Sequence, residues 1–161
     1  MEIQYLKTME ANSSFWNRKS RGFSLDKIEE LEQKLNNGIP FPKALREYLF
    51  LGGEFNSLGF DHEGIGQDGS EWIALKKYYE KEMRKNNLSI NRPYVVLDSY
   101  DGAIFSFIYL DEGDDPRPYN FSVSESYKGS NGETIYPFPE KTFSQLINRL
   151  VDYALRGLQP W

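Results

Sequence analysis

The sequence predicts an α+β domain in which a twisted antiparallel β-sheet, a meander with tight hairpins, is flanked by about four α-helices. Two observations support this fold class. Amphipathic helical patterns occupy the first half of the chain and its C-terminal part, and β-prone segments separated by turn signals lie between them. The 161 residues contain no linker, repeat or low-complexity tract, so we expect one domain over residues 1–161.

The helices are predicted from apolar residues that recur at helical spacing. They cover residues 25–35, 42–50, 71–85 and 143–155. Ser24 and Ser70 are suited to cap the first and third helices, and Pro42 fits the first position of the second. Thr142 and Gln145 form a capping box at the start of the last helix.

The strands are predicted from β-prone composition and from the turns between them. They cover residues 94–97, 103–110, 119–123 and 134–136. The second is apolar on both faces, which indicates a central strand with Ile104 or Phe105 in the main core. Asp101-Gly102 predicts a type I′ hairpin, and Asn131-Gly132 predicts a further hairpin before the last strand. Residues 1–23 predict only a short strand at 3–6 and a polar loop.

Composition restricts the classes of function. The chain has no cysteine, so it has neither disulfides nor a thiolate nucleophile, and no apolar run is long enough to cross a bilayer. The N-terminus lacks the features of a secretory leader, so we expect a cytoplasmic protein that binds no membrane. A net charge of −5 disfavours direct binding to nucleic acid.

Acidic residues are concentrated in two stretches without a Lys or Arg, residues 47–75 and 93–116. Each contains six acids, so the rest of the chain carries +7. Two solvated acidic loops explain this pattern as well as an acidic face for a basic partner does.

Three motifs suggest chemistry that their surroundings do not support. Gly64-x-Gly66-x-x-Gly69 matches a dinucleotide-binding fingerprint, but it lacks a preceding buried strand and its acids oppose phosphate, so we expect no nucleotide there. The single histidine, His62, is best interpreted as a surface residue. Residues 111–115 lack EF-hand spacing, and we expect no metal or other cofactor.

Ordered short motifs then suggest a family. They are Ile28-x-x-Leu31-Glu32, Leu35, Ile39-Pro40, Leu45-Arg46-x-x-Leu49, Gly52-Gly53, Asp115-Pro116-Arg117-Pro118-Tyr119 and Phe143-x-x-Leu146. Together they resemble the SUKH superfamily, which includes yeast cell-wall-assembly regulators of the Smi/Knr type and many bacterial toxin-immunity proteins. Leu51 stands where the family pattern has Asn, and Arg117 where it has Pro. The resemblance implies an α+β fold and carries over no catalytic residues.

The resemblance also implies a function. It favours a non-catalytic immunity protein that neutralises a basic toxin, such as a nuclease, by direct binding. A regulatory scaffold for cellular proteins is the alternative, and an enzyme of unknown type is less expected. Tyr100, Phe60 and Trp161 lie in turns or at the terminus and are candidate contact aromatics. The candidate partner-binding residues are Asp111, Glu112, Asp114, Asp115, Asp98, Tyr100, Asp101, Asp61, Glu63 and Asp68, with the cluster at residues 111–115 favoured.

Overall fold

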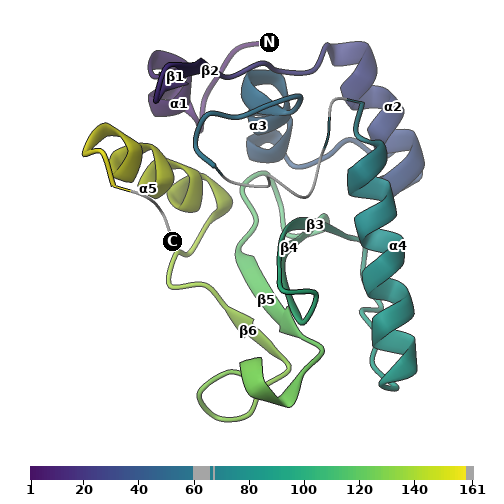
Figure 1. Cartoon of the computed structure of the whole chain (residues 1–161). Coiled ribbons are helices and arrows are strands. Elements are labelled where there is room, and N and C mark those ends of the chain that lie inside the picture. Colours follow the sequence, from purple (N-terminus) through teal and green to yellow (C-terminus); the bar gives the residue numbers. More distant parts are fainter. Residues whose placement is uncertain (60–65, 67, 159–161) are drawn as a thin grey trace.

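Helices surround a single four-stranded sheet in the computed structural model, which describes residues 1–59, 66 and 68–158 (Figure 1). The elements are α1 (Lys7–Ala11), β1 (Ser14–Phe15), β2 (Arg18–Lys19), α2 (Leu25–Asn36), α3 (Lys43–Gly52), α4 (Ser70–Lys85), β3 (Tyr94–Tyr100), β4 (Ile104–Tyr109), β5 (Pro118–Ser122), the 3-10 helix η1 (Glu125–Tyr127), β6 (Ile135–Pro137) and α5 (Phe143–Leu155). The predicted α+β class is confirmed, and α1 and a small β1–β2 hairpin are added to it.

The large sheet is an antiparallel meander in the order β3-β4-β5-β6, so β4 is a central strand as predicted. Residues 101–103 connect β3 to β4, and the Ala103 N–H donates to the Tyr100 carbonyl at 3.2 Å. The two central residues of this turn, Asp101 and Gly102, have φ angles of 51° and 63°. Positive φ at both central residues is what a type I′ turn requires, and it confirms that hairpin. A bulge between Val96 and Asp98 shifts the β3–β4 register before the turn.

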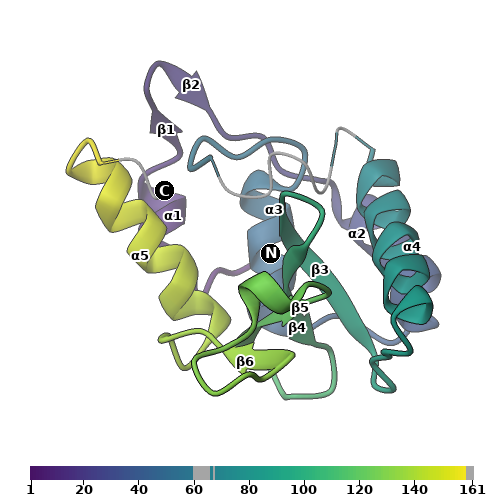
Figure 2. The same cartoon turned by 60° about the horizontal axis from the view of Figure 1, so that its bottom comes forward.

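Two hydrophobic clusters lie on the two faces of the sheet, because successive strand side chains alternate. Val95 and Ile108 belong to the larger cluster, with residues of α1, α2, α3 and α5. Val96 and Phe105 belong to the second, with Tyr79 of α4. Phe105 is therefore buried as expected, but beneath α4 and not in the larger cluster. Figure 2 shows α4 and α5 on opposite sides of the sheet.

The helix starts follow the predicted caps at α2 and α5 but not at α3 and α4. Pro42, predicted as the first helical residue, is instead the N-cap of α3, which begins at Lys43. The Ser24 and Thr142 side chains accept hydrogen bonds from the third residue beyond them, as predicted. The prediction of Ser70 as a cap is wrong, since Ser70 is already helical and Gly69, with φ 74°, takes that position. Asp68 provides the side-chain acceptor, 2.9 Å from the Ser70 backbone nitrogen.

The N-terminal segment differs from its prediction. Residues 3–6 form no strand. Ile3, Leu6 and Met9 are all buried in the larger cluster, so this part of the chain packs as an irregular segment leading into a short helix.

The last hairpin is longer than Asn131-Gly132 predicted. β5 and β6 pair antiparallel, with Phe121 opposite Ile135, but η1 lies in the connection between them. Gly132 has a φ of 84°, whereas Asn131 does not have a positive φ, so the type I′ geometry is absent at this pair.

Candidate protein-binding surface

The acids of the β4–β5 loop are bound within the molecule. The Arg92 guanidinium donates to both Asp111 carboxylate oxygens, at 2.6 and 3.2 Å, and to Glu112 at 3.2 Å. The same guanidinium lies 3.8 Å from the centre of the Tyr109 ring. The hydrogen bonds from Arg92 lower the pKa of Asp111. Arg92 immediately precedes the stretch 93–116, which has no Lys or Arg, so a count of charges within that stretch does not include it.

The other two acids of this loop contact the first residues of two helices. The Lys43 Nζ lies 2.7 Å from an Asp114 carboxylate oxygen, at the beginning of α3. Asp115 accepts the Ser144 N–H at 2.9 Å and the Ser144 hydroxyl at 2.6 Å, at the beginning of α5. The four acids of the favoured cluster therefore have structural partners, and two cations, Arg92 and Lys43, offset part of their negative charge.

The described acids of the earlier stretch do not form a continuous acidic face. Glu47 is buried, and Glu54 pairs with Arg21 at 3.0 Å. Asp68 is fixed at the start of α4, and its hydrogen bonds from Ser70 lower its pKa. Asp61 and Glu63, together with Phe60, His62, Gly64 and Trp161, lie outside the described residues.

The structure brings Asp98, Tyr100 and Asp101 together at the turn end of the β3–β4 hairpin. Asp98 accepts the Ser99 N–H at 2.8 Å, and Asp101 is exposed in the turn. Tyr100 is 66% exposed and is the most exposed large hydrophobic side chain of the described residues. β4 runs from this turn to the other end of the sheet, so this cluster is separated from Asp111–Asp115.

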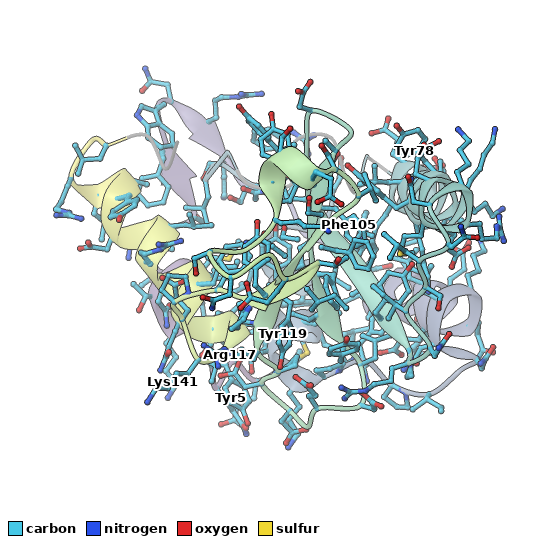
Figure 3. The ribbon with its side chains drawn as sticks, turned by 90° about the horizontal axis from the view of Figure 1, so that it is seen from below. Tyr5, Tyr78, Phe105, Arg117, Tyr119 and Lys141 are labelled. Carbon is cyan, nitrogen blue, oxygen red and sulfur yellow. The ribbon has the colours of Figure 1, made fainter. Side chains whose placement is uncertain are left out.

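Two tyrosines that the sequence interpretation did not select flank this turn. The Tyr78 side chain projects from α4, is 45% exposed, and its hydroxyl lies 3.2 Å from where a Cβ on Gly102 would be. On the other side, the Tyr127 ring of η1 packs edge-on to Tyr100 with 6.0 Å between centroids. Figure 3 shows Tyr78 at the α4 rim and Phe105 over the sheet. We name Tyr78, Tyr100, Asp101 and Tyr127 the tyrosine surface.

A sequence signal for Tyr78 existed. Tyr79 falls on the buried face of α4, and adjacent helical residues point about 100° apart, so Tyr78 has to leave that face. Tyr127 had no such signal, because its position depends on the β5–β6 connection.

Other kinds of site find little support among the residues that the structure describes. No group of three or more His, Asp or Glu side chains in these ranges could hold a metal ion. No helix in them has the length and apolarity to cross a membrane. The Glu71 carboxylate lies against Gly66, within 2.9 Å of where a Cβ would be, so the glycine-rich segment has an acidic neighbour.

Comparisons with protein-family models, with curated proteins and with solved structures give no match for this chain. The SUKH resemblance therefore stays a prediction, and the function has to be argued from the surface itself.

Proposed function

We propose that this protein is a non-catalytic, cytoplasmic protein-binding domain and that the tyrosine surface is its contact site. The observation that carries the proposal is the pair of exposed tyrosines, Tyr78 and Tyr100, on either side of a tight acidic turn. Tyrosine is enriched among the few residues that dominate binding energy, since it buries a large apolar ring at low entropic cost and keeps a hydroxyl for hydrogen bonding.

The surface is held in position before a partner arrives. Tyr100 ends a strand paired with β4, and the neighbouring Tyr79 hydroxyl donates to the Ile104 carbonyl at 3.1 Å, which ties α4 to the hairpin. Rigid anchors lose little conformational freedom on binding, so more of their contact energy contributes to affinity.

The acids around the turn indicate the charge of the partner. Asp98 and Asp101 lie beside Tyr100, so a basic partner is favoured by electrostatic complementarity. With the SUKH resemblance, this supports an immunity protein whose partner is a basic toxin domain such as a nuclease. The acids at residues 111–115 are a less favourable contact site, because Arg92, Lys43 and Ser144 already engage them.

The test is a titration calorimetry measurement with the purified product of the adjacent gene. We expect Tyr100→Ala and Tyr78→Ala each to weaken binding by more than about tenfold, as for interface hot spots. Tyr153→Ala, at a half-buried tyrosine on α5, is the matched control and leaves affinity unchanged.

A second set of variants distinguishes the two acidic clusters. If Asn or Gln at positions 111, 112, 114 and 115 abolishes binding in a folded protein while both tyrosine variants bind normally, the tyrosine surface is rejected. If the partner proves to be a cellular regulator without toxic activity, the protein is a regulatory scaffold and not an immunity protein.

A further inference from the structure

The small β1–β2 hairpin forms a second surface with the opposite charge. A surface hollow of about 260 Å³ is lined by Arg18, Lys19, Arg21 and Phe55. Figure 2 shows this hairpin projecting from the body of the molecule beyond α1, at the top of the view. The chain as a whole is acidic, so a group of three cations around one aromatic ring is a local exception.

The hollow has an excess of positive charge. Arg21 pairs with Glu54 at 3.0 Å, whereas no carboxylate of the described residues lies within ion-pair distance of Arg18 or Lys19. The three cations are exposed, and together with this one half-buried acid they leave a net charge of +2. Like charges this close repel one another, so a bound anion is favoured there.

The cations are pre-positioned. The Arg18 guanidinium carbon lies 4.4 Å from the centre of the Phe55 ring, and that of Arg21 lies 5.7 Å from it. The backbones of Arg21 and Phe55 exchange two hydrogen bonds of 2.7 and 3.0 Å. A Cβ on Gly22 would lie 1.5 Å from the Phe50 carbonyl oxygen, so this part of the chain sits directly on the end of α3. Fixed guanidinium groups lose less entropy on binding a carboxylate.

The hairpin also presents an exposed aromatic residue at its tip. Trp16 is 45% exposed and has a φ of 49°, and Asn17 follows with 61°. Left-handed backbone is uncommon for a bulky residue, and such outliers cluster at functional sites. Tryptophan and arginine are also two of the residue types most enriched at interface hot spots.

We propose that this basic hairpin surface, made of Trp16, Arg18, Lys19, Arg21 and Phe55, binds an acidic segment of a protein. Carboxylates of the segment pair with Arg18 and Lys19, and an apolar side chain between them contacts Phe55 and Trp16. The Arg21–Glu54 pair shows that one guanidinium of this surface already holds a carboxylate. The domain then has two contact sites, one for a basic partner and one for an acidic segment. A long polyanion such as nucleic acid fits less well, because the overall charge of −5 opposes it.

The test uses the full chain and a short fluorescein-labelled peptide in which glutamate pairs flank phenylalanine. Fluorescence anisotropy measures binding, and amide chemical shifts locate it. We expect saturable binding with shifts confined to residues 14–21 and 53–56. We expect the double variant Arg18→Gln, Lys19→Gln to weaken it by about tenfold or more, because it removes the two unpaired cations.

The control variant is Lys81→Gln, Arg84→Gln on the exposed face of α4, which removes the same charge elsewhere. Binding that weakens equally in both double variants is non-specific attraction and overturns the proposal. The same holds if the glutamine version of the peptide binds as well, or if inorganic phosphate at matched ionic strength displaces the peptide. Absence of any binding at millimolar peptide also overturns it.

Discussion

Glu47 holds the N-terminal segment against the rest of the molecule. Its carboxylate is buried and accepts the backbone N–H groups of Gln4, Tyr5 and Leu6, at 2.8, 2.8 and 2.9 Å. Hydrogen bonds to a charged acceptor are stronger than neutral ones, and the Glu47 side chain and Leu6 are buried away from water. One side chain thus replaces the strand pairing that residues 3–6 would otherwise need.

Removing this carboxylate is expected to be costly. Glu47→Ala leaves three backbone donors without an acceptor, and we expect a loss of about 3–5 kcal/mol in the free energy of unfolding. Urea unfolding followed by circular dichroism measures it. Glu54→Gln is the control, because Glu54 forms only an exposed ion pair with Arg21 and should cost less than about 1 kcal/mol. Equal losses in the two variants would contradict the anchoring role.

The stability that the Asp111–Arg92 ion pair contributes at the β4–β5 loop depends on pH. The pKa of Asp111 is lowered in the folded state by Arg92, so the ion pair contributes stability above the pKa of the unfolded chain, about 3.9. That contribution is lost as the pH falls through the lower folded pKa. Because the pair is exposed, the effect stays within about 1 kcal/mol.

Carboxyl NMR titration tests this prediction. We expect the Asp111 pKa to lie below its ordinary value in the native protein and to return toward it in Arg92→Gln. Glu133 is the control, because the hydrogen bond from Asn131 that lowers its pKa does not involve Arg92, and that pKa should be the same in both proteins. An Asp111 pKa that does not respond to Arg92→Gln would show that the ion pair does not form in solution.

At the scale of elements, the β3–β4 hairpin depends on its two turn residues. Gly102→Ala places a Cβ at a φ of 63° and 3.2 Å from the Tyr78 hydroxyl, so we expect a loss of about 1–2 kcal/mol. Asp101→Asn is the matched control, since Asn tolerates left-handed backbone, and it should leave stability unchanged. Thermal unfolding of both variants provides the measurement. A neutral Gly102→Ala would mean that the turn adopts another geometry.

The long elements could be predicted from sequence because their signals are local. The spacing of apolar residues predicts α2 to α5, and Asp101-Gly102 predicts the β3–β4 hairpin. The β1–β2 hairpin could not be found in this way, because its turn residues, Trp16 and Asn17, are not a recognised turn pair. The irregular path of residues 3–6 depends on Glu47, which is more than 40 positions away.

The candidate site was predicted only in part for a similar reason. Tyr100 and Asp101 mark the tyrosine surface in the sequence, because they belong to the turn itself. The pairing of Asp111 and Asp114 could not be foreseen, since Arg92 and Lys43 reach them only in the folded chain. A count of charge along the sequence measures composition, whereas a binding surface depends on which charges remain without a partner.

At the scale of the whole molecule, the two hydrophobic clusters share one sheet. Each of β3 and β4 contributes buried side chains to both, and α4 does the same through Trp72 in the larger cluster and Tyr79 in the second. Neither cluster can lose its packing without exposing the sheet face of the other. We therefore expect the domain to unfold as one cooperative unit.

One variant in each cluster tests this expectation. Leu150→Ala in the larger cluster and Phe107→Ala in the second should each lower stability by about 2–5 kcal/mol. Each variant should keep a single transition that coincides by near-ultraviolet and far-ultraviolet circular dichroism. Leu155→Ala is the control, because Leu155 is exposed. Two separated transitions in either cluster variant would show that the faces unfold independently.

The contacts of α4 with β3 have a consequence for self-association. The Trp72 indole N–H donates to the Val96 carbonyl, and the Lys76 ammonium donates to that of Tyr94 at 3.0 Å, so side chains of α4 occupy the outer edge of β3. The other edge strand, β6, has three residues and ends at Pro137, which has no N–H to offer. Open strand edges are the templates on which amyloid and domain-swapped assemblies grow. With one edge occupied and the other short, this sheet is a poor template for such growth, and a partner has to recognise side chains instead of extending the backbone ladder.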